Sequence, residues 1–232
     1  QLGREESAGA ALLVSNPNFR RTFALGIALQ MLQQFSGINV LMYYAPTVLN
    51  HMGFTASSSV WCTTAIGVVN TLATLAAVAL MDLWGRRLLL SISTFFSAVA
   101  MLGFGTLLWT GATSMTASVI AMGFLFLFIA AFAVGQGPLP WIIGSEIQPL
   151  RGRTFAVSCS TLASWIANWL ISNIFLSSMS VLGDFGVFWC LAGFNALFFV
   201  VGLILVPETK GCALEDIEDR INSGVRLRDA GQ

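Results

Sequence analysis

The 232-residue chain is 56% hydrophobic and only 9% charged, and its formal net charge at pH 7 is zero. A soluble domain carries roughly a quarter charged residues, so this composition excludes a water-soluble globule and predicts an integral membrane protein. The balanced charge, with a pI near 6.8, offers no attraction for nucleic acid. The four cysteines are widely separated, which predicts neither a disulfide framework nor a metal site.

The positions of the basic residues predict the membrane topology. Lys and Arg are absent from 22–85, 88–150 and 154–209, and each of these stretches is long enough for two helices of about 20 residues. Because cytoplasmic loops collect basic residues, each helix pair is expected to return the chain to the cytoplasm. The sequence therefore predicts an all-α membrane protein, a six-transmembrane-helix bundle with both termini cytoplasmic. The expected spans are 20–49, 60–80, 88–109, 115–140, 154–180 and 185–206.

The segments on either side of the bundle are more polar. Residues 1–18 are expected to be a cytoplasmic lead-in, because they lack the apolar core and cleavage site of a signal peptide. Residues 19–206 hold the six spans, and residues 207–232 are expected to form a solvated cytoplasmic tail, with a short amphipathic surface helix within 213–229. Outer loops are expected near 50–59, 110–114 and 181–184.

The first span is unusually rich in amides for a helix in lipid. Gln33 and Gln34 share one face, whereas Asn39 points roughly the opposite way in an unbroken helix. A break at Ser36-Gly37 would bring Asn39 round to that face, as interrupted helices do at midmembrane binding sites. The alternative is that these amides only hydrogen-bond neighbouring helices.

Other spans add polar candidates. Tyr43 and Tyr44 extend the first span outward, with hydroxyls suited to line or gate an opening. Asn70 is a lone midspan amide, for which a helix-packing contact is the simpler interpretation. Ser164 and Asn168 lie one turn apart and predict a polar strip on the fifth span.

The fourth span is interrupted within 135–141. Two glycines together with Pro138 and Pro140 break its regular hydrogen bonding, which is tolerated only against protein or water. Beyond the break, the indole of Trp141 is suited to stack on the apolar face of a sugar-like ligand. The alternative, an interfacial belt tryptophan, fits less well because the next basic cluster lies ten residues further on, at Arg151.

No catalytic or cofactor-binding constellation is present in the sequence. There is a single histidine, no span holds two carboxylates, and no phosphate-binding Gly-Lys-Ser/Thr loop occurs. The sequence thus predicts neither an enzyme nor a metal or cofactor site. An uncharged interior of amides and aromatics suits a neutral polyhydroxylated ligand, because amides both donate and accept hydrogen bonds.

Five motifs follow one another along the chain. They are Gln33–Asn39 followed by Tyr43-Tyr44, Asp82–Arg87, Gly137–Trp141 with Ser145–Ile147, Arg153, and Pro207–Gly211. Taken together and in this order, they resemble the C-terminal half of the sugar porter family of the major facilitator superfamily. The resemblance is strongest to the bacterial galactose– and arabinose–proton symporters.

The resemblance implies roles for particular residues. Ser164 stands where many members carry a sugar-binding asparagine, and Ala133 stands where facilitative members carry a glutamate. The residues implied to contact sugar are Gln33, Gln34, Asn39, Asn70, Trp141 and Asn168. A cytoplasmic salt-bridge network that clamps the two halves is implied for Asp82, Arg86, Arg87, Glu146, Arg153 and Glu208.

Family members have twelve spans in two bundles that rock about a central sugar. The resemblance places the proton-linked acid in the N-terminal six-span half, and this chain has no candidate proton acceptor at midmembrane. The function implied is transport of a neutral monosaccharide of the galactose, arabinose, xylose or glucose type by alternating access and proton symport across the inner (plasma) membrane. Its partners would be the monosaccharide, the proton, the lipid bilayer and the N-terminal half. The alternative is a non-transporting, truncated six-span half that acts as a sugar-binding or interaction partner.

Overall fold

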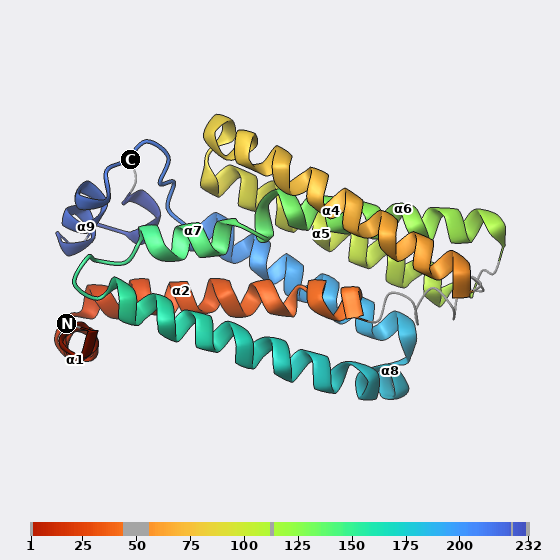
Figure 1. Ribbon diagram of the computed structural model, residues 1–232, viewed down its shortest axis with the longest axis horizontal. Coiled ribbons are helices and arrows are strands. Elements are labelled where there is room, and N and C mark those ends of the chain that lie inside the picture. Colours follow the sequence, from red (N-terminus) through yellow and green to blue (C-terminus); the bar gives the residue numbers. More distant parts are fainter. Residues whose placement is uncertain (1, 44–55, 112–113, 224, 231–232) are drawn as a thin grey trace.

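The computed structural model describes residues 2–43, 56–111, 114–223 and 225–230. Within these residues every regular element is a helix, and the long helices lie side by side in an elongated bundle with both termini at the same end (Figure 1). The helices are α1 (Leu2–Ser15), α2 (Pro17–Phe35), α4 (Ala56–Trp84), α5 (Arg86–Trp109), α6 (Met115–Ala131), the π-helical turn η1 (Phe132–Gln136), α7 (Leu139–Glu146), α8 (Arg153–Leu205), α9 (Leu214–Asn222) and the 3₁₀ turn η2 (Leu227–Asp229).

Four helical segments in the described part of the chain are long and apolar enough to cross a membrane. They bury only part of their surface within the bundle. Tryptophans project from its outside, and Trp61, Trp165 and Trp169 are each about two-thirds or more exposed. A soluble protein does not present such a surface, and it is the surface expected of a bundle solvated by lipid. The four segments are Trp61–Trp84, Arg86–Trp109, Met115–Glu146 and Arg153–Leu205.

The longest helix, α8, contains two antiparallel arms. Gly183 has φ 73° and ψ 165°, a left-handed conformation that breaks the helix within a single residue. Figure 1 shows α8 reversing direction at the end of the bundle opposite the termini. The sequence prediction of a four-residue loop at 181–184 is therefore corrected, because one glycine performs the reversal.

The first predicted span is also two helical pieces. Asn16 caps the start of α2: its side chain accepts from the N–H groups of Asn18 and Phe19, while Pro17 is the first helical residue. α2 stops at Phe35, and helix resumes at residues 38–43 after Gly37, which has φ 96°. A Cβ on Gly37 would lie 2.8 Å from a methyl carbon of Leu191, so both the backbone angle and the close approach require glycine.

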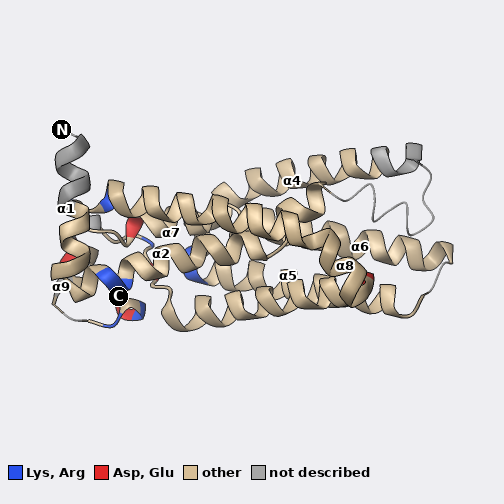
Figure 2. Ribbon diagram, turned by 90° about the horizontal axis from the view of Figure 1, so that it is seen from below, with Lys and Arg blue, Asp and Glu red and all other residues tan. Residues whose placement is uncertain are grey.

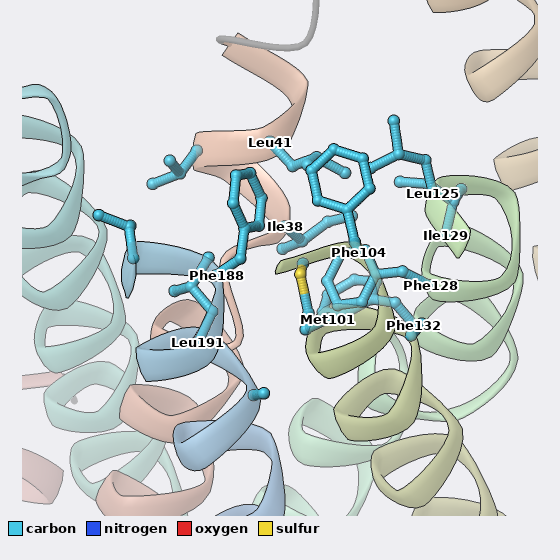
Figure 3. Packing of buried hydrophobic residues seen from close by; sticks show 14 of the residues in the cluster. Ile38, Leu41, Met101, Phe104, Leu125, Phe128, Ile129, Phe132, Phe188 and Leu191 are labelled. Carbon is cyan, nitrogen blue, oxygen red and sulfur yellow. The ribbon is translucent and has the colours of Figure 1, made fainter. Parts of the chain in front are cut away.

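One large apolar cluster contains residues from both sides of Gly183 and, from the first span, buried residues beyond the break at Gly37. In Figure 3, aromatic and aliphatic side chains from α5, α6 and α8 converge on Ile38 and Leu41 from the segment beyond the break. Phe104 and Phe188 meet edge to face with ring centroids 4.6 Å apart, and both are essentially buried. This packing fixes the helices that carry the polar residues described below.

Charged residues gather at one end of the bundle. Figure 2 shows Lys and Arg toward the end that holds both termini, where α2, α5 and α8 begin. We call this the charged end. The basic positions thus lie where the topology predicted from the sequence requires them, on a single side of the bundle.

The tail packs against the bundle, whereas the sequence predicts a solvated end for residues 207–232. Ile217 and Ile221 of α9 are 1% and 5% exposed, and with Ala230 they form a small apolar cluster. Glu218 accepts a 3.0 Å hydrogen bond from the backbone N–H of Leu150, which ties α9 to the loop before α8. The tail is therefore a folded cap on the charged end.

Candidate functional site

A polar hollow of about 320 Å³ lies between α2, α4 and the broken fourth span. Its volume is near the lower limit of the roughly 300–1,000 Å³ usual for small-molecule sites. All nine residues around it are uncharged: Gln33, Gln34, Ile38, Asn39, Met42, Asn70, Phe132, Gly137 and Trp141.

The break in α2 brings its amides together. Asn39 Nδ2 donates to Gln34 Oε1 over 2.6 Å, although the two residues would point apart in a continuous helix. Gln34 Nε2 in turn donates to Ser164 Oγ at 2.8 Å, which links this chain of amides to α8. The amides therefore present a fixed set of donors and acceptors to the hollow.

The break in the fourth span is held by Gln33. Pro140 has no N–H to pair with the carbonyl of Gln136, and Gln33 Nε2 supplies the missing donor at 2.8 Å. The same nitrogen lies 2.6 Å from the carbonyl oxygen of Gly137, while the Gly137 N–H closes a π-type turn on Phe132. Such turns are frequent at functional sites. Gln33 thus both lines the hollow and stabilises its wall.

Two buried amides that sequence reasoning did not single out support this wall. Gln136 Nε2 donates to Asn195 Oδ1 at 2.8 Å, and Asn195 Nδ2 donates to the carbonyl of Ser36 at 3.1 Å. Ser93 Oγ accepts from the Gln136 N–H at 2.9 Å and donates to the carbonyl of Ala131. The available signals were one glutamine between two glycines and one asparagine in an otherwise apolar run, but neither signal indicates that the two residues meet.

Four other predicted site residues in the described part of the chain are not among those that line the hollow. Asn168 is 9% exposed, and its Oδ1 has no hydrogen-bond partner among the described residues. Pro138 and Pro140 shape the start of α7 rather than lining the space. Tyr43 is 60% exposed at the end of the described segment. Tyr44 lies outside the described residues.

At the charged end, Arg86 forms ion pairs with two acids. Its guanidinium lies 3.6 Å from the carboxylate of Glu146 and 3.8 Å from that of Asp82, which is one turn away and largely exposed. Glu146 also accepts a hydrogen bond from the hydroxyl of Thr209. These contacts join the start of α5 to the end of α7 and to the tail.

The other three residues of the predicted network bind backbone groups instead. Glu208 accepts from the N–H groups of Arg86 and Arg87 at 2.9 and 3.2 Å, because the first turn of α5 presents unpaired donors there. The guanidinium of Arg87 donates to the carbonyl of Leu203, and Arg153 donates to that of Gln148. In this conformation the expected network is thus a smaller set of ion pairs with helix-capping contacts around it.

Comparison with known proteins identifies the family. The family model described as "Sugar (and other) transporter" matches residues 2–220. The chain belongs to this family. Within it, this sugar-transporter chain is 43% identical over 227 residues to the galactose-proton symporter of Escherichia coli K12, and 36% identical over 230 residues to the arabinose-proton symporter of the same strain. Each alignment covers 97% of the chain and 49% of the relative.

Solved structures show the same fold. The proton:xylose symporter XylE, a major facilitator superfamily protein solved with 6-bromo-6-deoxy-D-glucose bound, superposes with a TM-score of 0.77 at 30% identity. That match covers 94% of this chain and 46% of XylE. The inward-open structure of XylE from E. coli gives a TM-score of 0.76 over 89% of this chain and 43% of that one. This sugar-transporter chain therefore corresponds to half of a major facilitator fold, and it spans about half the length of the relatives that it matches.

Proposed function

We propose that this chain supplies one half of a transport site for a neutral monosaccharide, with the hollow at the helix breaks as its sugar-binding surface. The observation that carries this proposal is the convergence of Gln34, Asn39, Asn70 and Trp141 from four separate helical segments on one small space. Amides alternate donors and acceptors as sugar hydroxyls do, and an indole offers a flat apolar face.

The neutral lining of the hollow favours a sugar over an ion. A charged ligand is costly to desolvate without a counter-charge, and none of the lining residues is ionisable. The relatives named galactose- and arabinose-proton symporters support the galactose and arabinose classes as substrates. Xylose and glucose types are the other candidates.

Proton coupling is assigned to a second half. Because no residue that lines the hollow titrates, the proton-linked acid belongs to an N-terminal six-span half that closes over this surface. The additional length of the relatives has room for such a half. Sugar and proton then cross by alternating access, as the two bundles rock about the site.

The ion pairs at the charged end form a clamp that is made and broken in this cycle. The pair of Arg86 with Glu146 joins α5 to α7, and α7 directly follows the broken wall of the hollow. A partly exposed pair contributes only about 0–1 kcal/mol, so it biases the conformational equilibrium without locking it. The positive-inside rule places the charged end and both termini in the cytoplasm, with the bundle in the inner membrane.

A second candidate is a six-span half that binds sugar or a partner without transporting. The observation that favours it is that none of the nine residues around the hollow is ionisable, so the same surface suits sugar binding without proton coupling. Uptake of labelled galactose, arabinose, xylose and glucose into proteoliposomes separates the two, comparing the chain alone with the chain joined to a six-span N-terminal half. We expect saturable uptake only for the joined protein. Saturable uptake by the chain alone would contradict the assignment of coupling to a second half.

A further inference from the structure

A second hollow, of about 550 Å³, lies at the charged end, away from the sugar-binding surface. One side is formed by Arg21 in the second turn of α2, and another by Ile204 and Leu205, the last residues of α8. Residues 226–229 of the tail complete it. The hollow therefore lies where α2 begins and the long apolar helix α8 ends.

The tail residues around this hollow are held in place by packing. Leu227, which lies between Arg226 and Arg228, packs against two apolar clusters. One contains Leu25 and Phe198 of the bundle, and the other is the small cluster formed by α9 and Ala230. The 3₁₀ turn there is closed by the Asp229 N–H, which donates to the carbonyl of Arg226 at 2.9 Å. Arg226 and Arg228 thus flank a fixed anchor.

The positive charge of the hollow is not compensated within the described residues. Arg21, Arg226 and Arg228 are all exposed, and in the described part of the chain none of their guanidinium groups forms an ion pair. Asp229 lines the same space without approaching any of the three within ion-pair distance. Three cations and one anion leave the hollow with an excess of positive charge.

The rim beside these arginines is apolar and accessible. Ile204 and Leu205 are 57% and 44% exposed, and they end a helix that is long and apolar enough to cross the membrane. A ligand that fills this hollow therefore contacts guanidinium groups on one side and the apolar side chains of Ile204 and Leu205, which face lipid acyl chains, on the other. Free phosphate matches only the first of these surfaces.

We propose that this hollow binds the phosphate-bearing headgroup of an anionic phospholipid, with the start of its acyl chains against Ile204 and Leu205. Guanidinium groups bind phosphate oxygens in a bidentate fork, and basic pockets at the cytoplasmic ends of spanning helices attract anionic headgroups. The proposal needs the chain to be embedded in a membrane, but it does not depend on the sugar site or on transport.

Native mass spectrometry of the whole chain in detergent tests this site, with phosphatidylglycerol and phosphatidylcholine as the added lipids. We expect phosphatidylglycerol to bind at least about tenfold more tightly, since each arginine near anionic lipid contributes about fivefold. The triple variant R21A/R226A/R228A is expected to bring the ratio close to one. R151A is the matched control, because Arg151 is exposed at the same end of the chain's bundle but does not line the hollow.

The unfolding midpoint of each variant shows whether it still folds. If the triple variant does not, the single variant R228A is expected to lower the lipid preference about fivefold. Equal binding of the two lipids by the wild type, or an unchanged preference in a folded arginine variant, would overturn the proposal. Displacement of the lipid by an equal concentration of inorganic phosphate would also overturn it, in favour of a free-anion site.

Discussion

The side-chain amide of Gln136 donates a 2.8 Å hydrogen bond to Oδ1 of Asn195, and both side chains are completely shielded from solvent. Asn195 also donates to the carbonyl of Ser36, next to the break in α2, while Gln136 lies in the break of the fourth span. One asparagine therefore connects the two helix breaks that shape the polar hollow. Neither amide lines that hollow itself.

Replacing Asn195 by Ala is expected to weaken sugar binding without removing any sugar contact. The change leaves the Gln136 amide and the Ser36 carbonyl without partners in the interior, which costs about 1–3 kcal/mol. If the whole of this cost falls on the sugar-binding conformation, the sugar affinity decreases about 5- to 150-fold. Asn173→Ala is the matched control, because that amide is exposed and bonds only within its own helix. Equal sugar affinity in the two variants would show that the bridge does not position the site.

A double-mutant cycle isolates the pair itself. Gln136→Leu leaves Asn195 Oδ1 without its donor, and Asn195→Leu leaves Gln136 Nε2 without its acceptor, whereas the double variant contains neither of these two atoms. The double variant is therefore expected to unfold at a higher temperature than the sum of the two single effects predicts. Strictly additive midpoints would mean that the bond makes no net contribution to stability.

Gly37→Ala tests the break in α2. An alanine there adopts an unfavourable positive φ, at about 1–2 kcal/mol, and its Cβ meets Leu191 at 2.8 Å. We expect a lower unfolding midpoint together with weaker sugar binding, because Asn39 lies two residues beyond the break. Leu191→Ala removes the clash but leaves a cavity in the core, which by itself costs about 2–5 kcal/mol. The effect of Gly37→Ala is therefore compared in the wild-type and Leu191→Ala backgrounds, and we expect it to be smaller, but not zero, in the second. Gly67→Ala is the control, because nothing lies within 4 Å of its added Cβ.

The first turn of α5 is stabilised by Glu208. Its carboxylate accepts from two N–H groups there, so Glu208→Ala is expected to cost about 1–2 kcal/mol and to lower the unfolding midpoint by several degrees. Asp82→Ala removes a 3.8 Å pair whose acid is 80% exposed, and it should leave the midpoint nearly unchanged. Thermal unfolding in detergent compares them, and a larger effect for Asp82 would reverse this assignment.

Trp141 is expected to contribute an apolar stacking face to sugar binding. Trp141→Ala should weaken sugar binding about tenfold, whereas Trp141→Phe should retain part of the affinity. Trp165→Ala is the control, because that indole is 65% exposed on the outside of the bundle. Equilibrium dialysis with labelled D-galactose measures all three variants. Full affinity in Trp141→Ala would place the sugar elsewhere.

Much of this arrangement follows from local sequence features. Runs without Lys or Arg predict the spanning helices, and Gly37 and Pro140 mark the breaks, because glycine and proline act on their own backbone. Gln33, Gln34 and Asn39 were found by their density within one span. These signals are local, so a single sequence is sufficient to show them.

Long-range pairings could not be predicted in the same way. Nothing in the spacing of Gln136 and Asn195 indicates that they meet, because that contact depends on how α8 packs against η1. The capping role of Glu208 and the burial of Ile221 likewise depend on where the tail lies against the bundle. Asn168 does not line the hollow, and its contact with sugar stays a prediction.

Sugar binding to the hollow is the central claim, and Gln34 tests it most directly. Its amide accepts from Asn39, donates to Ser164 and lines the space, so Gln34→Ala removes one lining amide and two hydrogen bonds that hold its neighbours. The measurement is equilibrium binding of labelled D-galactose, in protein joined to a six-span N-terminal half, by the wild type, Gln34→Ala and the control Asn173→Ala. We predict at least about a tenfold loss of affinity for Gln34→Ala and none for the control. Unchanged galactose affinity in a folded Gln34→Ala variant would contradict this account.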